Sequence, residues 1–507
     1  MAVAAVHVLV FPWPLQGHIN TFVPFSNALV DSGVHVTFLH TEHNLRRVRC
    51  TAAAPRLRYM SIPDGLPADH PRSVGDISTL MESMWTTGAA AYHALLLSLL
   101  SSPTTDEGGE FFPPVTCVVA DGIMMFAVDI AEELGVPALA FRTASANSFS
   151  AYLAVPRLLE RGETPLPVDD PVRGVPGMES FLRRRDLPRL APAAADGHPT
   201  TESYTTPAAG GVHPFLLTVA KGIADCGRAR ALVLNTAASL EGPALAHISR
   251  HMRDVFAIGP LHAMPSSAAP AAAAGSLWRE DDGCVAWLDG HADRSVVYVS
   301  LGSLTHISHD EFTEFLLGLL ATGHPFLWVL RPDMVGAAEE EALRRAVGDG
   351  TKVRVVGWAP QRDVLRHRAV GCFLTHSGWN STMESILEGV PMVCWPFFAD
   401  QHINSRFVEA VWGAGLDMKD VCDRDTVRSM VTEAMESGEM RRSVQALAQR
   451  VQRDVTTGGS SETEFKRLVG FITELSTMNR NQAKSIPVMN GVMISHKGED
   501  TRREACI

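Results

Sequence analysis

The feature that most constrains the fold is a regular alternation of short apolar runs with segments of helical length. In the first half of the chain, the apolar runs lie at residues 6–11, 34–39, 56–62, 115–120, 137–141, 231–235 and 255–259. They read as nearly continuous apolar runs, as do strands that helices cover on both faces. This alternation of β and α segments predicts a doubly wound, parallel α/β sheet.

The same alternation restarts after a stretch of low complexity. Residues 260–275 are rich in Pro, Ala and Ser, a composition typical of a linker. Beyond them, apolar runs recur at residues 295–300, 325–330, 353–358, 370–375 and 391–395. We therefore expect two Rossmann-like domains, over residues 1–259 and 260–479, that face each other across a cleft. Ligands of such sheets bind at the carboxyl ends of the strands, so this cleft is the expected site.

The last part of the chain is expected to differ from both domains. Residues 480–507 are polar and show no helical period, which predicts a disordered tail. The helix that precedes this tail is the element that we expect to pack back from the second domain on the first.

Composition and charge exclude several classes of protein. The 20% of charged and 46% of apolar residues are those of a globular chain. The net charge of −12 comes without a basic block, so nucleic acid is not an expected partner. No apolar run approaches the roughly 18 residues of a membrane span, and the apolar start lacks the features of a signal peptide. The eight cysteines form no CxxC pair, which favours reduced thiols in a cytoplasmic protein, and we expect a monomer.

A turn between a strand and a helix predicts an anion-binding site. The sequence reads as a strand at residues 370–375, the turn HSGWNS at residues 376–381, and a helix behind it. Helix N-termini present backbone N–H groups that bind anions readily. Four side chains of the turn can also donate hydrogen bonds to a diphosphate, namely His376, Ser377, Asn380 and Ser381. Alone, such a turn is an ordinary helix cap as often as it is an anion-binding site, so the prediction depends on the residues around it.

Polar and aromatic residues on both sides of this turn extend the expected ligand. Trp358, at the end of a strand, offers a flat face to a base, and Gln361 follows at the start of a helix. Glu384, in the first turn of the next helix, can accept from two adjacent ribose hydroxyls. Asp400 and Gln401 suit the hydroxyls of a sugar. Each residue alone has a simpler explanation in the core or on the surface, but their joint spacing favours base, ribose, diphosphate and sugar in that order.

A histidine and an aspartate in the first half form a second candidate site. His18 follows the first strand, and Asp121 directly follows the run at residues 115–120. Both therefore lie at carboxyl ends of parallel strands, where a doubly wound sheet places its active site. A histidine can take a proton from a hydroxyl near neutral pH, and a carboxylate on its other ring nitrogen fixes the tautomer. Singly, each residue is more often a helix cap.

The 44 residues from Trp358 to Gln401 resemble the signature box of the plant family 1 UDP-glycosyltransferases at nearly every diagnostic position. The resemblance includes the Gly-His pair after the first strand, residues 276–289 and 295–303, and the segment SSETEFKRLVGFI, and it ends near residue 479. It implies the GT-B fold and an inverting transfer of glucose from UDP-glucose to a hydroxyl, giving a β-glucoside. The implied acceptor is a small lipophilic molecule such as a flavonoid, a simple phenol, a terpenoid or a hormone-like compound.

The resemblance also implies roles for individual residues. His18 would act as the general base and Asp121 as the acid that orients it. The residues implied to bind UDP are Ser303, Trp358, Ala359, Gln361, His376, Gly378, Asn380, Ser381 and Glu384. Those implied to hold the sugar are Thr143, Trp379, Asp400 and Gln401. A Gln at the end of the box is associated with glucose and a His with galactose, which is why UDP-glucose is the expected donor.

One position departs from the family pattern. Thr21 stands where the family usually has Pro in its GHxxP stretch. Because the base itself is present, we expect this change to affect only the start of the helix.

The acceptor pocket is expected in the regions that the family varies most. These regions are residues 81–85, 122–125, 147–149 and 165–215, and they contain Met, Phe and Trp, which suit an apolar and adaptable pocket. The candidate lining residues are Trp85, Ile123, Met124, Asn147 and Phe398. Core packing explains the same side chains equally well.

Competing chemistries have weaker support in the sequence. No GxGxxG follows the first strand, and no Walker A or HExxH motif occurs, which disfavours a dehydrogenase, an NTPase and a zinc protease. The one DxD sequence, residues 423–425, is best explained as a helix cap, so we expect neither a metal nor a cofactor. Two alternatives stay open: the same enzyme with another UDP-sugar, and a catalytically silent binding protein for a nucleotide-sugar or small ligand. Binding alone needs no base, so His18 and Asp121 argue against the silent protein.

Overall fold

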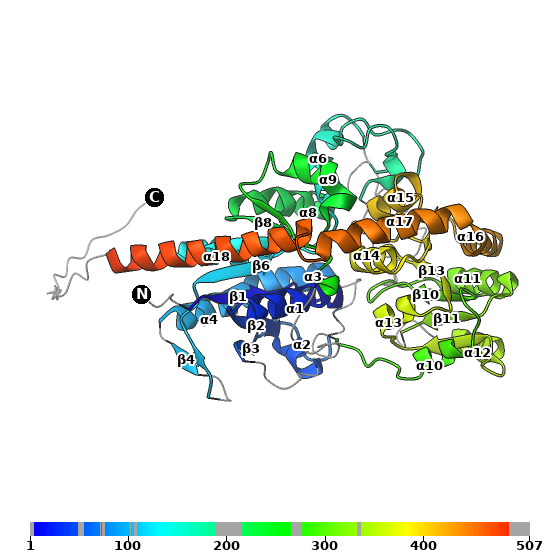
Figure 1. Ribbon diagram of the computed structural model, residues 1–507, viewed down its shortest axis with the longest axis horizontal. Coiled ribbons are helices and arrows are strands. Elements are labelled where there is room, and N and C mark those ends of the chain that lie inside the picture. The colour runs from blue at the N-terminus through cyan, green and yellow to red at the C-terminus, as the bar shows by residue number, and fades with distance from the viewer. Residues whose placement is uncertain are drawn as a thin grey trace, which may run out of the picture.

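The computed structural model describes residues 5–48, 55–70, 72, 77–101, 103–105, 109–163, 165–188, 214–264, 276–331 and 336–485. Within these ranges the chain forms two α/β domains side by side (Figure 1). Each domain is built on a sheet of parallel strands, so the predicted fold class is confirmed.

The first sheet has seven parallel strands in the order β3-β2-β1-β6-β7-β8-β9. Their bounds are β1 His7–Phe11, β2 His35–Thr41, β3 Leu57–Ile62, β6 Cys117–Asp121, β7 Ala138–Arg142, β8 Leu232–Leu234 and β9 Val255–Ala257. The strand order reverses between β1 and β6, and the carboxyl ends of such a pair flank the crevice in which open α/β sheets bind ligands. A short antiparallel pair, β4 (Thr104–Thr105) and β5 (Phe111–Phe112), forms a separate small sheet.

Helices connect these strands. They are α1 Gln16–Asp31, α2 Glu42–Arg47, α3 Ile77–Ser83, α4 Ala89–Ser101, α5 Met125–Glu133, α6 Ala146–Glu160, α8 Pro214–Asp225 and α9 Ala238–Ile248. A π-helical turn, η2 (Met84–Gly88), joins α3 to α4, and short 3-10 turns lie at η3 Arg184–Asp186, η4 Cys226–Arg228 and η5 Leu261–Ala263.

Both faces of the first sheet are buried, which explains the continuous apolar runs. In β1, Leu9 and Phe11 belong to the core on one face, whereas Val8 and Val10 belong to the core on the other. Successive side chains of a strand point to opposite faces, so burial of both faces requires an apolar residue at every position. All four side chains are fully buried.

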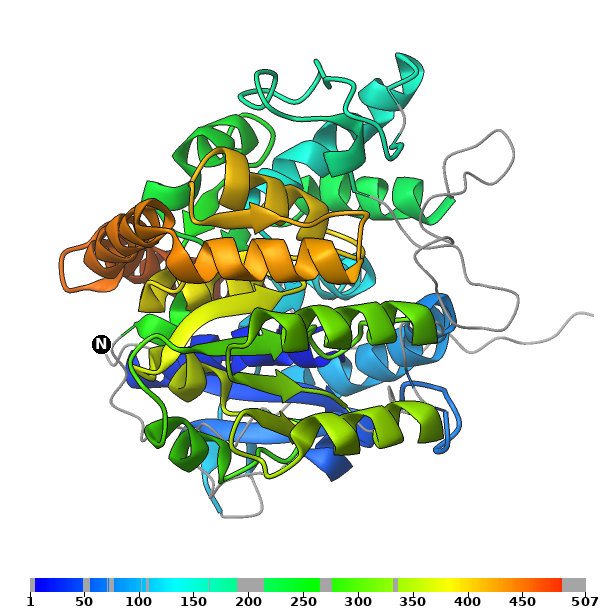
Figure 2. The ribbon, with the colours of Figure 1, turned by 90° about the vertical axis from the view of Figure 1, so that its right-hand side faces the viewer.

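The second sheet has six parallel strands in the order β12-β11-β10-β13-β14-β15. Their bounds are β10 Val296–Ser300, β11 Phe326–Val329, β12 Val353–Val356, β13 Val370–Thr375, β14 Met392–Cys394 and β15 Gly415–Asp417. Its helices are α10 Cys284–Asp289, α11 His309–Thr322, α12 Ala337–Val347, α13 Gln361–Arg366, α14 Trp379–Glu388, α15 Gln401–Ala410, α16 Arg424–Glu436 and α17 Gly438–Val455. Figure 2 turns this domain toward the viewer.

The last helix returns the chain to the first domain. α18 (Ser460–Ser485) lies along that domain in Figure 1, and its Phe465, Leu468 and Ile472 join the core on the Val8 face of the first sheet. The helix therefore continues past residue 479, where we expected a disordered tail to begin. An anchored helix can extend through polar residues because each added residue closes a hydrogen bond without a new nucleation step. The rest of the predicted tail, residues 486–507, lies outside the described residues, as do residues 265–275 of the predicted linker.

A buried cluster of charges joins the two domains. Asp186 of the first domain contacts Lys419 of the second, with 2.5 Å between carboxylate oxygen and Nζ, and the same Nζ lies 3.0 Å from Asp417. All three side chains are at most 2% exposed. Buried charges require close partners, and Arg183 also contacts both carboxylates, at 2.9 Å from Asp186 and 3.4 Å from Asp417. The cluster therefore fixes how residues 165–188 sit against the second domain.

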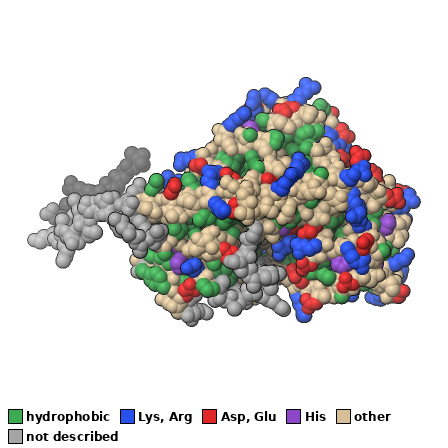
Figure 3. Space-filling model, in the orientation of Figure 1, with side chains coloured by type: hydrophobic (Ala, Val, Ile, Leu, Met, Phe, Trp, Pro, Cys, Tyr) green, Lys and Arg blue, Asp and Glu red, His purple; other side chains and the backbone are tan. Residues whose placement is uncertain are grey.

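The outer surface carries both signs of charge. On the face that Figure 3 shows, Lys and Arg side chains are interspersed with Asp and Glu over the second domain. Of the described helices, none combines the length and the apolar character that crossing a membrane would require.

Candidate active site

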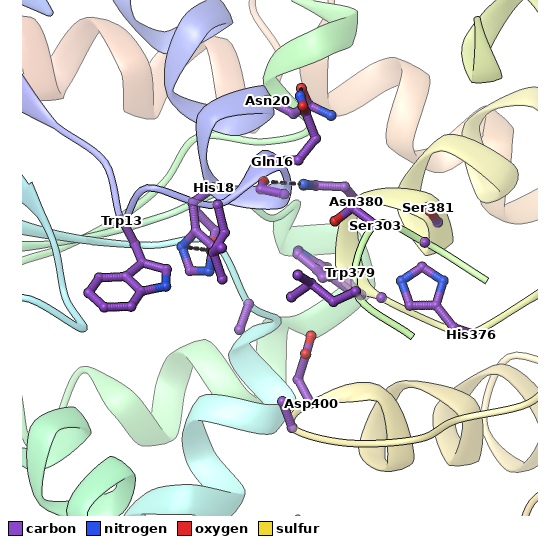
Figure 4. Close-up of a pocket in the computed structure, with 18 of the residues that line it drawn as sticks. Trp13, Gln16, His18, Asn20, Ser303, His376, Trp379, Asn380, Ser381 and Asp400 are labelled. Atoms are coloured by element: carbon purple, nitrogen blue, oxygen red, sulfur yellow. Dashed lines mark hydrogen bonds between the residues drawn. The ribbon is translucent and has the colours of Figure 1, made fainter. Parts of the chain in front are cut away.

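A cavity of about 1100 Å³ lies between the two domains. Its lining residues follow strands of both sheets, for example His18 after β1, Thr143 after β7, Ser303 after β10 and His376 after β13. Figure 4 shows that side chains of the first domain, such as His18, face those of the second, such as Asn380. Pockets for one small ligand usually measure about 300–1000 Å³, so this cavity has room for two.

The predicted pair of His18 and Asp121 is assembled at the edge of the first sheet. β1 and β6 are parallel neighbours, with Phe11 opposite Ala120, so the residues that follow them meet. His18 Nδ1 lies 2.6 Å from Asp121 Oδ2. An ionised carboxylate only accepts hydrogen bonds, so Nδ1 carries the proton and donates it, and Nε2 is left as an acceptor. The pair has the arrangement of a general base and its orienting carboxylate.

The surroundings of Asp121 keep it ionised. Burial, the largest single influence, would raise the pKa of this carboxyl, but the contact with His18, the charge of Arg142 and the N–H of Ile123 together outweigh burial and hold the pKa below its usual range. The backbone N–H of Ile123 also donates to Asp121 Oδ1 at 3.1 Å, and that of Trp13 donates to Oδ2 at 3.3 Å. Thr143 Oγ1 lies 3.0 Å from His18 Nδ1, so this residue, expected at the sugar, also braces the imidazole.

The turn before α14 is shaped around His376. Ser377 adopts a left-handed φ of 63°, and Gly378 forms the N-cap of α14. A Cβ atom at Gly302 would lie 2.6 Å from His376 Nε2, and one at Gly378 would lie 2.4 Å from it, so both positions need glycine. Burial lowers the pKa of His376 to about 4, which keeps its ring neutral. Ser303 and Ser381 line the cavity beside this helix N-terminus.

The residues expected at the ribose form one hydrogen-bonded group. Gln361 Nε2 donates to Glu384 Oε2 at 2.7 Å and to Ser381 Oγ at 2.9 Å. The Tyr298 hydroxyl donates to Gln361 Oε1 at 3.3 Å, which fixes the orientation of the amide. Burial raises the pKa of the Glu384 carboxyl above its usual range, and Gln361 opposes that shift.

The aromatic face expected for a base is a pair of tryptophans. The rings of Trp358 and Trp278 are stacked, with centroids 5.9 Å apart and planes 20° apart. Arg47 of the first domain lies over the Trp278 ring at 5.4 Å. Trp358 and Ala359 line the cavity, and their contact with uridine stays a prediction. Trp278 was not predicted, because it does not lie at the carboxyl end of a predicted strand, although it belongs to the segment 276–289 that carries the family resemblance.

The predicted sugar residues differ in what they can offer. Gln401 Oε1 accepts from the backbone N–H groups of Phe397 and Phe398 at 2.8 and 3.1 Å, which leaves its Nε2 to donate into the cavity. Asp400 accepts from Asn404 at 2.8 Å and also lines the cavity.

Trp379, also predicted at the sugar, lines the cavity and bonds to the first domain through its side chain. Its indole N–H donates to the carbonyl of Asn235 at 2.8 Å, and the ring is 3% exposed. The side chain therefore holds the two domains together, and only its backbone N–H, at the first residue of α14, is left for a sugar.

The acceptor side contains part of the predicted set. Trp85, on the π-helical turn, lines the cavity together with Ile123 and Phe398. Met124 lies instead in the core of the first domain and is fully buried. Asn147 is also buried, and its backbone N–H donates to Glu241 at 2.9 Å. Neither residue is among those that line the cavity, because the turn after β6 and the first turn of α6 direct these side chains inward.

Comparison with known proteins agrees with this geometry. The family model of UDP-glucoronosyl and UDP-glucosyl transferases matches residues 246–450. A myricetin 3-O-rhamnoside 1,2-glucosyltransferase of Crocosmia x crocosmiiflora is 42% identical, over 93% of this chain and 96% of that protein. This chain belongs to the plant family 1 UDP-glycosyltransferases.

Two further relatives extend the comparison. A 7-deoxyloganetic acid glucosyltransferase of Catharanthus roseus is 40% identical, over 93% of this chain and 98% of that protein. The crystal structure of Os79 from O. sativa in complex with UDP matches with a TM-score of 0.70 and 25% identity, over 92% of this chain and 100% of that one. The chain is thus a UDP-glycosyltransferase with the GT-B fold.

Thr21, which departs from the family pattern, does more than begin a helix. Its Oγ1 lies 3.0 Å from Asn380 Oδ1 and 3.2 Å from the carbonyl of Gly17. Asn380 Nδ2 also donates to that Gly17 carbonyl at 2.7 Å. A proline has no hydroxyl, so this glycosyltransferase has a contact across the cavity that the usual residue could not make. Our expectation that only the helix start is affected was too narrow.

Proposed function

We propose that this enzyme transfers glucose from UDP-glucose to a hydroxyl of a small lipophilic acceptor with inversion, giving a β-glucoside. The observation that carries the proposal is the placement of the His18–Asp121 pair, which faces the N-terminus of α14 across one cavity. In a single displacement, the base would activate the attacking acceptor hydroxyl, and the anion-binding turn would stabilise the departing diphosphate.

The chain's residues define the steps. His18 Nε2 accepts the proton of the acceptor hydroxyl, and Asp121 stabilises the resulting imidazolium. The acceptor oxygen attacks the anomeric carbon from the face opposite the diphosphate, and the bond from that carbon to the phosphate oxygen breaks. The electron pair leaves with UDP. Backbone N–H groups at the start of α14, with the side chains of Ser303 and Ser381, then meet the developing charge.

The uridine and sugar are assigned to the second domain. Trp358 offers its ring to uracil, and Glu384, freed in part from Gln361, accepts from the ribose hydroxyls. Asp400 and Gln401 hold the glucose hydroxyls, as acceptor and donor respectively. Both relatives described above are glucosyltransferases, which supports glucose as the sugar.

The acceptor is assigned to the first domain. Trp13, Trp85 and Ile123 give this part of the cavity an apolar, aromatic lining. The two relatives are named for a flavonol rhamnoside and an iridoid acid, which supports a small plant metabolite that carries a hydroxyl.

The direct test is product analysis with UDP-glucose and a panel of phenols. We expect release of UDP in equal amount to a glucoside, and a large coupling between the first two sugar protons in the proton NMR spectrum, which marks the β-anomer. An α-glucoside would contradict inversion. Release of glucose alone, or no turnover with any acceptor, would contradict the transfer.

A further inference from the structure

A buried arginine lies at the acceptor side of the cavity. Arg142 is the last residue of β7, directly before Thr143, and it lines the cavity while only 7% of its surface is exposed. A Cβ atom at Gly122 would lie 2.5 Å from Arg142 Cδ, so the glycine after β6 makes room for the arginine stem. The side chain therefore occupies a site shaped for it.

The guanidinium of Arg142 has no close partner among the described residues. Its Nε is shut off from solvent without a hydrogen bond, and none of its nitrogens lies within 4.0 Å of a carboxylate oxygen of the residues that the structure describes. Nearby carboxylates are engaged elsewhere, Asp121 with His18 and Asp400 with Asn404. Their charges act on Arg142 only through space. A buried cation without a contacting anion is costly, and most proteins pair it.

A second unpartnered group lies near the arginine. Tyr152, on α6, lines the same cavity, is 3% exposed, and makes no hydrogen bond through its hydroxyl to any described residue. Burial raises the pKa of this phenol above its usual range, which keeps the hydroxyl protonated as a donor. Thr218 and Val219 of α8 complete this wall of the cavity.

We propose that Arg142, with Tyr152, forms a subsite for an anionic group of the acceptor, and that the preferred acceptors are hydroxy acids bound through their carboxylate. The subsite rests on the proposed function, since the same acceptor must present its hydroxyl to His18. The product is then an O-glucoside with a free carboxylate, because the carboxylate is held at Arg142 and the hydroxyl is the nucleophile.

The chemistry of the arginine favours a carboxylate over the donor's diphosphate. Guanidinium and carboxylate form paired, charge-assisted hydrogen bonds of matching geometry. The start of α14, where the diphosphate is expected, is not among the described neighbours of Arg142, which include Gly122 and Tyr152 of the first domain and, through space, Asp400 of the second. A carboxylate here removes the desolvation cost that the unpaired cation carries.

The test uses acceptors in matched pairs, each a phenolic acid and its methyl ester. 4-Hydroxybenzoic, 4-hydroxyphenylacetic and 4-hydroxycinnamic acids vary the distance from carboxylate to hydroxyl. In at least one pair we expect native kcat/KM to be about tenfold or more higher for the acid, the range of a charge-assisted hydrogen bond. Equal or better use of the ester in all three pairs would overturn the proposal.

Variants separate charge from packing. Arg142→Gln should lower the acid-to-ester ratio of kcat/KM by about 10- to 100-fold, and Arg142→Lys by less, because it keeps the charge. The ratio cancels differences in phenol reactivity and any general loss of activity. Arg366→Gln removes another cation of the cavity lining, one that already pairs with Glu388, and should leave the ratio within about twofold. An unchanged ratio in Arg142→Gln would overturn the subsite.

A binding measurement keeps the subsite testable apart from turnover. Trp13 and Trp85 line the cavity, so quenching of tryptophan fluorescence reports ligands there. Phenylacetate should bind native protein more tightly than its methyl ester does, and Arg142→Gln should abolish the difference. Transfer to esters without any preference for acids would overturn only the subsite. A preference in binding without transfer to any acceptor would support the subsite and contradict the proposed function.

Discussion

The donor side and the acceptor side of the cavity are built in different ways. Much of the donor side comes from the continuous stretch between Trp358 and Gln401, which forms α13, β13, a turn, α14 and β14, and the end of β10 adds Ser300, Gly302 and Ser303. The acceptor side comes from separate parts of the first domain, in residues 13–28, 77–85, 122–123, 142–152 and 218–222. Local spacing fixes the geometry of the first side, whereas tertiary packing fixes that of the second.

This difference has a consequence for what each side can tolerate. The ring of His376 requires glycine at Gly378, in the turn before α14, and at Gly302, after β10, and Ser377 has a left-handed backbone, so the shape of this turn is narrowly set. The acceptor side has a π-helical turn that carries the 40% exposed Trp85. We therefore expect changes on the donor side to act on one step for all acceptors, and changes on the acceptor side to act on the choice of acceptor.

The largest expected effect is that of His18→Ala, which should impair the chemical step and leave the donor side intact. His18→Ala removes the base, whose side chain makes hydrogen bonds to Asp121 and Thr143 and to none of the residues implied to bind UDP, so turnover should fall by about 10²- to 10⁴-fold while the affinity for UDP stays close to native. Steady-state kinetics with an aliphatic alcohol acceptor and calorimetric titration with UDP measure the two quantities. Unchanged turnover would remove His18 from the mechanism, and a parallel loss of UDP binding would indicate a structural defect instead.

The next largest effect concerns the choice of donor sugar. Native enzyme should use UDP-glucose well above UDP-galactose, because Gln401 presents a fixed donor at the sugar and the two sugars differ only at the 4-hydroxyl. Gln401→His should narrow that ratio, mainly by harming glucose transfer, by roughly 5- to 150-fold, the range for loss of a matched buried contact of about 1–3 kcal/mol. The measurement is kcat/KM for both donors with one acceptor. A native preference for galactose, or an unaltered ratio, would show that Gln401 is not the selector.

A smaller effect tests the contact that bridges the two sides. Thr21→Val removes the hydroxyl that meets Asn380, at a cost of about 0.5–1.5 kcal/mol, and should raise KM for UDP-glucose by roughly 2- to 12-fold. Thr21→Ser keeps the hydroxyl and is the matched control. If the Val and Ser variants have the same KM for UDP-glucose, the contact between Thr21 and Asn380 does not contribute to donor binding.

The smallest expected effect is that of a chelator. No group of three or more His, Cys, Asp or Glu side chains in the described ranges could hold a metal ion. The start of α14 offers backbone donors for the diphosphate instead. Activity after dialysis against EDTA should therefore equal that before it. A complete loss that manganese restores would contradict this expectation.

The sheets and the His18–Asp121 pair could be predicted from the sequence, whereas the lining of the acceptor side could be predicted only in part. The parallel sheets follow from continuous apolar runs, and the meeting of His18 with Asp121 follows from the pairing of β1 with β6. On the acceptor side, Ile123 lines the cavity while the adjacent Met124 is in the core. Whether a side chain in this turn lines the cavity or enters the core changes from one residue to the next, and the hydrophobic periodicity of the sequence does not show which it does.

Contacts between the domains were also beyond prediction. The indole of Trp379 bonds to Asn235, which is 144 residues away, and Thr21 meets Asn380 over 359 residues. Arg142 is the last residue of an apolar strand, and its place at a strand end did not by itself show that its side chain would be buried without a partner. Such pairs depend on how the two domains dock, which local spacing does not encode.

The most direct test of the central claim is the dependence of kcat/KM on the acidity of the acceptor, measured for native enzyme and His18→Ala with one series of phenols at a fixed pH. If His18 removes the acceptor proton, weakly acidic phenols should lose about 10²- to 10⁴-fold in the variant. Phenols whose pKa lies below the assay pH are already ionised and should lose little. A loss of the same size across the whole series would contradict the account, because it would mean that His18 shapes the site without accepting the proton.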